Sequence, residues 1–456
     1  METDPSAPQP LASVGIVGGG QLAWMLAEAA AAIGLELHVQ TPAAEDPAVR
    51  SATSAVIAPL EDGAATADLA RRCGAISFEN EWLPLAPLAP LAAAGVAFLP
   101  SLEALAPLVS KRAQRQLLHD LHLPAPQWCP LESVVPPAPN PSTASSAPTA
   151  PPSTAPLATP PPSTAPTSAT PAAPATDAAT DPAATAIAPA GGAALFSPEL
   201  RLPEGFEFPL MAKASQGGYD GRGTRTIADL QELRQLLASV DPAGWILEEL
   251  VPFERELALT ACRDRLGNVV CFPLVETHQH QRVCDWVLYP APVDHAVRAF
   301  GRNVAASLLT ALDYVGVLTV EFFWGPRGLQ VNELAPRTHN SGHLTIEAFR
   351  HSQFEQQLRA VAGLPLGLIE PLLEGALMVN LLGLRDGDEE HAAERQALEQ
   401  LEGARLHWYG KRGGGLGRKL GHLTLPLVGS SVAEREEQRR RRLAEVRAIW
   451  PLPEGD

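Results

Sequence analysis

The stretch that most constrains the fold runs from residue 321 to residue 340, Glu-Phe-Phe-Trp-Gly-Pro-Arg-Gly-Leu-Gln-Val-Asn-Glu-Leu-Ala-Pro-Arg-Thr-His-Asn. Its apolar residues predict two strands, 316–324 and 329–333, joined by a tight glycine-flanked turn. Such a hairpin can bring Glu321 and Glu333 to one face of a sheet. Paired carboxylates repel each other unless a divalent cation lies between them, and hard oxygen ligands suit Mg²⁺. We therefore predict a metal pair here, with two surface acids as the alternative.

A dense polar loop follows, Arg337-Thr-His339-Asn340-Ser-Gly-His343. Arg337 offers a planar fork suited to bicarbonate or phosphate, and His339 and Asn340 add donors that can be oriented. So many polar and small residues beside a predicted metal ligand are hard to explain as core. We expect an anion site, in which His343 is a structural donor rather than a catalyst.

A second candidate site surrounds Lys213, which ends a predicted strand at 208–213. Four glycines follow within the seven residues Gly217–Gly223. Backbone amides of such a loop can approach a polyphosphate while the lysine supplies a point charge. No Gly-Lys-Ser/Thr follows, so this is not a Walker A loop, and a flexible hairpin is the alternative. The next predicted strand, Trp245–Glu249, leads into an acidic linker. This linker could bind adenine and ribose, or it could be an ordinary solvated strand end.

The N-terminal part alternates short apolar strands with a helix, which predicts an open parallel sheet. The expected strands are Val14–Val17, Leu35–Val39, Ala55–Ile57, Ala75–Phe78 and Val96–Phe98, with a helix at Gln21–Ile33. The turn Gly18–Ala23 fits the loose dinucleotide pattern G-x-G-x-x-A. The second strand ends Val-Gln-Thr without the acid that a nicotinamide enzyme places there. The turn could still cradle another phosphate or a ribose, and tight strand–helix packing is an equal alternative.

The chain is acidic and rich in proline. Lys and Arg number 34 against 51 Asp and Glu, a net charge of −17. This disfavours a general nucleic-acid or anionic-membrane binder but permits a local basic pocket. The length of 456 residues predicts about three domains. The 45 prolines and 5% aromatic content are unusual for a uniformly folded chain.

Residues 136–190 account for much of the excess proline. The segment repeats Pro-Pro-Ser-Thr-Ala-Pro and contains no aromatic residue, Lys or Arg. We predict a disordered insertion, because it cannot bury enough apolar surface to offset its ordering entropy. A docking segment for a proline-binding module is the less favoured alternative.

The insertion interrupts a chain of mixed α/β and α+β class. We expect a Rossmann-like parallel-sheet domain at 11–108, the helical start of a second domain at 109–135, its main part at 206–368, and a small β-rich domain with a terminal helix at 369–456. In the last of these, Lys411-Arg-Gly-Gly-Gly-Leu-Gly-Arg418-Lys419 is a basic glycine-rich loop. It suggests a phosphate pocket, with a surface turn as the alternative.

Five cysteines without a CxxC pair indicate neither a disulfide framework nor a thiolate zinc site, so we expect a reducing cytoplasm. The acidic N-terminus is unlike a secretory signal. The uncharged run Leu83–Leu102 contains prolines that would break a helix, so we expect no membrane span. His278 and His280 lie on a segment expected to be irregular and are not assigned as metal ligands.

Taken in order, these motifs resemble the ATP-grasp superfamily and, within it, the family of N5-carboxyaminoimidazole ribonucleotide synthases of purine biosynthesis. The segments that carry the resemblance are Gly18–Leu22, Gly217–Gly223, Glu248–Glu256, Val331–His343, Ser352–Gln356, His407–Lys411 and Gly417–His422. The resemblance implies an ATP-grasp fold between the Rossmann-like domain and the small β-rich domain. It also implies a homodimeric ligase that uses ATP and Mg²⁺ to activate bicarbonate as carboxyphosphate and then carboxylates 5-aminoimidazole ribonucleotide.

The resemblance further implies roles for individual residues. ATP would contact Lys111, Lys213, Gly217, Gly218, Tyr219, Asp220, Gly221, Arg222, Gly223, Glu248, Glu249, Leu250, Val251, Glu256, Asn332 and Glu333. Mg²⁺ would be held by Glu321 and Glu333. The catalytic set would be Arg337, His339, Asn340, Asp220 and Lys411. The ribonucleotide would contact Gln21, Leu22, Tyr219, Asp220, Arg337, Lys411, Arg418 and Lys419.

Three other functions compete with this one. Another carboxylate–amine or formyl-transferring ligase of the same superfamily is disfavoured by the loop after Glu333 and by the Lys411 region. A nicotinamide oxidoreductase rests only on the N-terminal glycine turn. A silent nucleotide-binding scaffold would not need to retain both carboxylates and the Arg337 loop.

Overall fold

The computed structural model describes residues 9–135, 200–217, 223–385, 387, 391–411, 415–429 and 431–453. The chain divides into two compact units, one of Met1–Ser133 with Pro203–Asp456 and the other of Val134–Leu202. The predicted disordered insertion and Gly218–Arg222 lie outside the described residues. At the ends of the second unit the Arg201 N–H donates to the Val134 carbonyl oxygen at 3.0 Å. The two stretches of chain that bound the insertion therefore meet.

A four-stranded parallel sheet forms the N-terminal part of the first unit. Its order is β3-β2-β1-β4, with β1 (Ser13–Val17), β2 (Glu36–Thr41), β3 (Ser54–Ile57) and β4 (Ile76–Phe78). The accompanying helices are α1 (Gln21–Ala32), α2 (Gly63–Ala70), α3 (Ala89–Ala93) and α4 (Leu102–Leu105). The strand expected at Val96–Phe98 is reduced to one bridge between Ile76 and Phe98. The predicted parallel sheet is otherwise confirmed.

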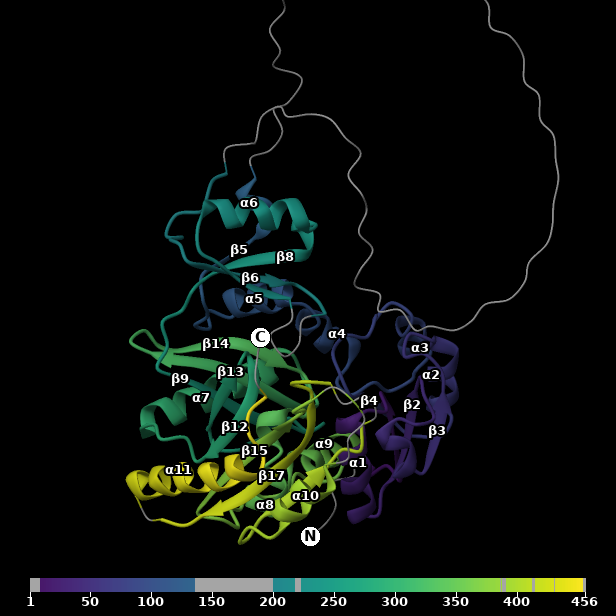
Figure 1. Ribbon diagram of the computed structural model, residues 1–456. Coiled ribbons are helices and arrows are strands. Elements are labelled where there is room, and N and C mark those ends of the chain that lie inside the picture. The colour runs from purple at the N-terminus through teal and green to yellow at the C-terminus, as the bar shows by residue number, and fades with distance from the viewer. Residues whose placement is uncertain are drawn as a thin grey trace, which may run out of the picture. The chain divides into compact units, whose positions relative to one another are not determined.

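A small antiparallel sheet follows, in the order β5-β8-β6-β7. Its strands are β5 (Trp128–Pro130), β6 (Leu210–Ala214), β7 (Thr224–Ile227) and β8 (Trp245–Glu249), and its helices are α5 (Lys111–Asp120) and α6 (Leu230–Ser239). The two helices lie on opposite faces of the sheet (Figure 1). Helix α6 begins at Leu230, because Asp229 caps it by accepting the Gln231 and Glu232 N–H groups. The residues just before it, Thr224–Ile227, pair with β6.

The largest sheet has nine strands in the order β14-β13-β9-β11-β12-β15-β17-β16, with β10 paired to β9. The strands are β9 (Arg255–Arg263), β10 (Val269–Cys271), β11 (Val275–His280), β12 (Val283–Tyr289), β13 (Gly316–Gly325), β14 (Gly328–Ala335), β15 (Gly375–Leu382), β16 (Arg405–Trp408) and β17 (Lys419–Leu427). The hairpin predicted from the sequence, β13–β14, is confirmed as an antiparallel pair, and β9 and β10 form a second one.

The expectation of an irregular segment around His278 and His280 was wrong. Both residues lie on β11, which pairs with β9 on one side and β12 on the other. The His278 ring stacks on Trp286 of β12, with ring centroids 5.0 Å apart. Pairing with two distant strands supplies what the polar local sequence lacks.

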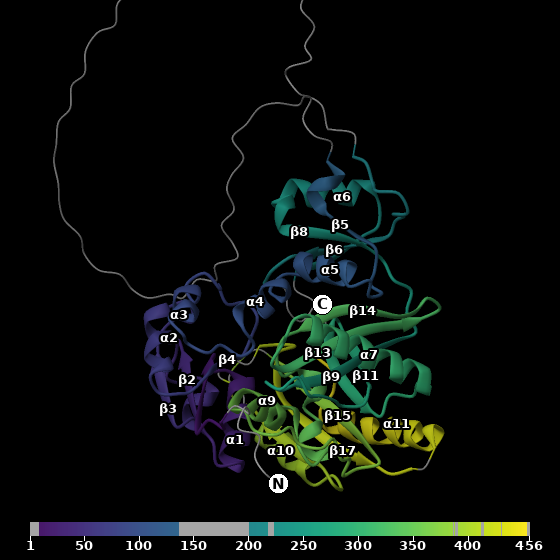
Figure 2. The same ribbon diagram turned by 180° about the vertical axis from the view of Figure 1, so that it is seen from behind.

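The C-terminal strands extend the same large sheet, since β15 pairs with β12 along four residues. Helices α10 (Ala392–Glu399) and α11 (Val432–Ile449) accompany them, and α11 lies along β15 and β17 (Figure 2). Leu443, Val446 and Ile449 of α11 pack with Trp450 in one apolar cluster. These contacts hold the terminal helix against the extended sheet.

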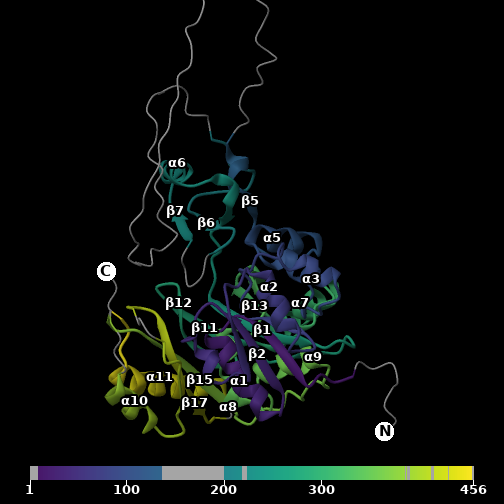
Figure 3. The same ribbon diagram turned by 90° about the vertical axis from the view of Figure 1, so that its right-hand side faces the viewer.

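The N-terminal sheet and the large sheet share one apolar core that includes Phe78, Leu259 and Leu318. Helix α9 (Gln353–Ala362) packs against α1 and β1, as Figure 3 shows. The remaining elements are α7 (His295–Ala311), α8 (Thr345–Ala348) and short 3₁₀ turns at Pro47–Arg50, Ala106–Leu108, Leu131–Val134, Pro242–Gly244 and Asn340–Gly342. Among the described residues, no helix combines the length and the apolar character needed to cross a membrane.

Candidate active site

Two carboxylates face each other across β13 and β14. Glu321 and Glu333 are direct partners in the antiparallel register, so they project from one face of the sheet, as predicted. Burial and the neighbouring Glu333 charge raise the pKa of Glu321 to about 7. Burial would also raise the pKa of Glu333, but the charge and hydrogen bond of Lys111 lower it. Near neutral pH the pair therefore carries between one and two negative charges, because Glu321 is only partly ionised.

The donor set of this pair fits a magnesium ion that binds together with a nucleotide. Among the described residues, no three His, Cys, Asp or Glu side chains gather closely enough to hold a metal ion by themselves. Magnesium commonly takes only one or two carboxylates and completes its octahedron with phosphate oxygens and water. Two carboxylate groups facing each other meet that need.

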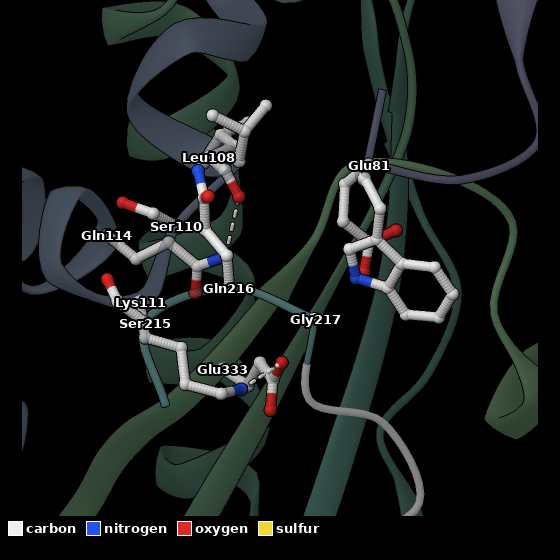
Figure 4. A pocket seen from close by; sticks show the side chains of 11 residues that line it. Glu81, Leu108, Ser110, Lys111, Gln114, Ser215, Gln216, Gly217 and Glu333 are labelled. Atoms are coloured by element: carbon white, nitrogen blue, oxygen red, sulfur yellow. Dashed lines mark hydrogen bonds and ion pairs between the residues drawn. The ribbon is translucent and has the colours of Figure 1, made fainter. Parts of the chain in front are cut away.

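Lys111 is the first residue of α5 and reaches the carboxylate pair. Ser110 caps the helix by accepting the Ala113 N–H at 3.1 Å. The Lys111 Nζ lies 2.5 Å from Glu333 Oε1, and Figure 4 shows the two side chains pointing toward each other. The pocket around them is lined by Glu81, Trp82, Leu108, Val109, Ser110, Gln114, Ser215, Gln216 and Gly217 as well.

Lys213, on β6, is the second cation expected at the nucleotide phosphates. Its Nζ lies 2.8 Å from Glu248 Oε2 and donates to Asn332 Oδ1 at 3.2 Å. Arg115 holds the other Glu248 oxygen at 2.6 Å. Burial would raise the pKa of Glu248, but the charges of Arg115 and Lys213 outweigh it and lower the pKa to about 2. The Glu248 side chain thus fixes Lys213 in place.

The other linker residues have varied surroundings. The Glu249 carboxylate accepts from Arg327 at 2.7 Å, Leu250 is exposed, and Val251 is buried. Burial raises the pKa of Glu256, and the charge of Glu256 helps to raise the pKa of Glu321. Glu256 therefore adds negative charge near the carboxylate pair, while Lys111 opposes it there.

Arg337 is held by Glu81, a residue that the sequence analysis did not single out. The Arg337 Nε donates to Glu81 Oε2 at 2.6 Å and its NH2 donates to Oε1 at 3.2 Å. A third donor, NH1, reaches the Thr338 carbonyl oxygen at 3.1 Å. Burial would lower the pKa of Arg337, but the charge and hydrogen bonds of Glu81 and the charge of Glu333 raise it. Arg337 therefore stays a cation at the edge of the pocket.

His339 is a neutral donor directed at the carboxylate pair. Burial, with help from the Arg337 charge, lowers its pKa well below the usual value. Its Nδ1 accepts the Ser341 N–H at 3.3 Å, so the ring proton resides on Nε2. That nitrogen lies 3.4 Å from Glu321 Oε1.

Asn340 is tied to the C-terminal strands. Its amide exchanges two hydrogen bonds with Asn380 of β15, at 3.0 and 2.8 Å. Asn380 in turn donates to the Cys284 carbonyl oxygen at 2.8 Å. The polar loop after Glu333 is thereby fixed to the part of the large sheet that the C-terminal strands extend.

The residues expected at the ribonucleotide meet at the start of α1. Gln21 accepts from Lys411 Nζ at 3.0 Å, and its amide nitrogen lies 3.0 Å from His343 Nε2. Lys411 also lies over the Tyr409 ring, 5.1 Å from the centroid. The structure therefore brings Gln21 and Lys411 together from opposite ends of the chain, beside the polar loop. His343 is buried, and its Nδ1 lies 3.2 Å from the Gln353 amide nitrogen; because that amide nitrogen donates, His343 accepts at this contact instead of acting as the expected donor.

The glycine turn before α1 is closed by Glu79, another residue that the sequence analysis missed. The Glu79 carboxylate accepts the N–H groups of Gly20 at 2.7 Å and Leu22 at 3.1 Å. A Cβ on Gly18 would lie 2.4 Å from the Glu79 Cβ. The turn amides are thus committed to a protein carboxylate, which favours the packing interpretation over a phosphate cradle.

The structure gives less detail on the remaining predicted site residues, which are Lys419, Arg418 and those of the glycine loop. Lys419 begins β17, and its charge contributes to lowering the pKa of His339. Arg418 is exposed. Gly217 and Gly223 are the described ends of the glycine loop, while Gly218, Tyr219, Asp220, Gly221 and Arg222 lie outside the described residues.

Comparison with known proteins identifies the family. Family models match a ribonucleotide synthetase preATP-grasp domain at residues 11–108, an ATP-grasp domain at 199–354, and a phosphoribosylaminoimidazole carboxylase C-terminal domain at 376–438. The N5-carboxyaminoimidazole ribonucleotide synthase of Synechococcus elongatus is 42% identical over 448 residues, covering 98% of each chain.

Two solved structures are similar throughout their length. The N5-carboxyaminoimidazole ribonucleotide synthetase of Thermus thermophilus is 29% identical with a TM-score of 0.73, covering 97% of this chain and 100% of its own. The Aspergillus clavatus enzyme, solved with ADP and 5-aminoimidazole ribonucleotide, has a TM-score of 0.72 at 23% identity, covering 96% and 99%, and supports the fold alone. On these matches, the chain belongs to the N5-carboxyaminoimidazole ribonucleotide synthase family of ATP-grasp ligases.

Proposed function

We propose that the chain carboxylates the exocyclic amine of 5-aminoimidazole ribonucleotide with bicarbonate, consuming ATP through carboxyphosphate and releasing ADP and phosphate. The observation that carries this proposal is the facing pair Glu321 and Glu333, ringed by Lys111, Arg337 and neutral His339. Phosphoryl transfer depends on positioning and charge neutralisation more than on covalent chemistry. The family supports the choice of substrate.

Cations on both sides of the pocket would handle the nucleotide phosphates. Lys111 and Lys213 supply charge from α5 and β6, and both are now held by carboxylates. Glu321 and Glu333 would hold Mg²⁺, which neutralises phosphate oxygens when bound. Adenine and ribose would lie near Glu249, Leu250, Val251 and Glu256, next to Asn332 and the glycine loop with Tyr219 and Arg222.

The polar loop would handle bicarbonate. Arg337 offers N–H donors for its oxygens, and a neutral His339 can donate without adding charge. On the other side, Gln21, Lys411, Arg418 and Lys419 would contact the ribonucleotide, whose phosphate needs cations. Excluding water would protect carboxyphosphate from hydrolysis. We also propose a homodimer in the cytoplasm, which sedimentation and fractionation would test.

The test is phosphate release from ATP and Mg²⁺ with bicarbonate, with and without 5-aminoimidazole ribonucleotide. We expect strong stimulation by the ribonucleotide. For Glu333→Gln we expect kcat to fall about 100-fold or more, because this variant loses one of the two carboxylates proposed to hold the Mg²⁺ that neutralises the phosphate oxygens. No stimulation would refute the substrate, and unchanged turnover in Glu333→Gln would refute the metal role. Glu402→Gln, at an acid remote from the pocket, serves as control.

A further inference from the structure

The guanidinium of Arg337 is bound along one edge before any ligand arrives. Nε and NH2 bond Glu81, and NH1 bonds the Thr338 carbonyl oxygen. Arginine has five N–H groups, so within the described part of the chain one N–H remains on each terminal nitrogen. Two N–H groups on adjacent nitrogens match the two oxygens of one planar carboxylate-type anion.

Glu81 is itself fixed in place. Its side chain is only 11% exposed, and it lies two residues after Glu79, whose carboxylate binds the amides at the start of α1. The segment after β4 therefore cannot shift without disturbing that helix start. Because both partners of this ion pair are anchored, Glu81 fixes the orientation of the Arg337 guanidinium in addition to neutralising its charge.

Carboxylates dominate the surroundings of Arg337. Glu81, Glu333 and Glu79 all raise its pKa by their charge. Since Glu81 already balances the guanidinium, an incoming anion gains little net attraction and meets repulsion that grows with its own charge. A monoanion such as bicarbonate is penalised less than the dianion of inorganic phosphate.

We infer that Glu81 is a positioning and specificity-determining residue, which presents one pair of Arg337 N–H groups to bicarbonate and disfavours phosphate at the same place. The inference rests on the proposed role of Arg337. Glu81 lines the pocket, and the role inferred for it is exerted through its two hydrogen bonds to Arg337.

The experiment compares wild type, Glu81→Gln and Glu81→Asp in steady-state turnover, with bicarbonate varied and inorganic phosphate added as inhibitor. For Glu81→Gln we expect the bicarbonate KM to rise about tenfold, the ATP KM to stay within twofold, and the ratio of the phosphate inhibition constant to the bicarbonate KM to fall at least tenfold. Glu81→Asp keeps the charge and should restore most of this ratio. The matched control is Glu370→Gln, which breaks a similar two-bond pair with Arg350 at 2.5 and 3.1 Å on the surface.

The outcomes are distinct. A Glu81→Gln ratio within twofold of wild type would overturn the inference. Equal losses in all kinetic constants with a lowered Tm would also overturn it, because they would indicate a purely structural residue. If the wild type itself shows no bicarbonate-dependent turnover, the proposed function fails, whatever Glu81 does.

Discussion

At the scale of single residues, the carboxylate pair stores a proton. Because burial and Glu333 raise the pKa of Glu321 to about 7, the native state holds a proton between about pH 4.5 and 7 that the unfolded state has released. Stability must therefore fall as pH rises through that window.

Glu321→Gln should remove this dependence. Without nucleotide or metal, we expect the wild type to lose on the order of 2 kcal/mol more than the variant between pH 5 and pH 8. Urea unfolding at pH 5, 6, 7 and 8 measures it. Parallel profiles for the two proteins would contradict the raised pKa.

Sequence reasoning found most of the charged groups at this scale but missed their counterions. The spacing of Glu321 and Glu333 within one hairpin is a local signal, and so is the polar loop that begins with Arg337. Glu81 is 256 positions from its arginine, and nothing near it in the chain marks the contact. Local sequence thus identifies which groups do chemistry, while tertiary contacts decide which of them are already paired.

At the scale of elements, capping decides where helices begin. Ser431 accepts the Glu434 N–H, and the Glu434 side chain accepts the Ser431 N–H, which together form a capping box at α11. The cap was not identified from sequence, although the terminal helix was. Strand β11 was missed because its support comes from β9 and β12 rather than from its own polar residues.

Ser431→Ala should lower the free energy of unfolding by about 1 kcal/mol and leave kcat and KM unchanged, since α11 lies away from the catalytic pocket. Chemical unfolding together with the turnover assay checks both parts. Ser431→Thr, which can still accept the amide, should lose less. A catalytic defect without a change in stability would contradict this view of α11.

At the scale of the whole molecule, a long insertion interrupts the part of the chain that forms the catalytic pocket. Replacing 136–190 by a short Gly-Ser turn should leave turnover within about twofold, because Val134 and Arg201, on either side of the insertion, already form a hydrogen bond. The phosphate-release assay and thermal unfolding measure the outcome. A large loss of activity with a normal fold would give the insertion a role in catalysis, against the prediction from its composition.

The hydrogen bond between Arg201 and Val134 also bears on how this chain can change over evolutionary time. The closure entropy of a loop whose ends meet grows only with the logarithm of its length, so lengthening a loop from about 4 to about 64 residues costs about 2.5 kcal/mol. About half of that cost falls in the first dozen or so residues added, and each later addition costs progressively less. Segment length at this point can therefore drift between related proteins, and the same point can accept a foreign domain or a fluorescent reporter without remodelling the catalytic unit.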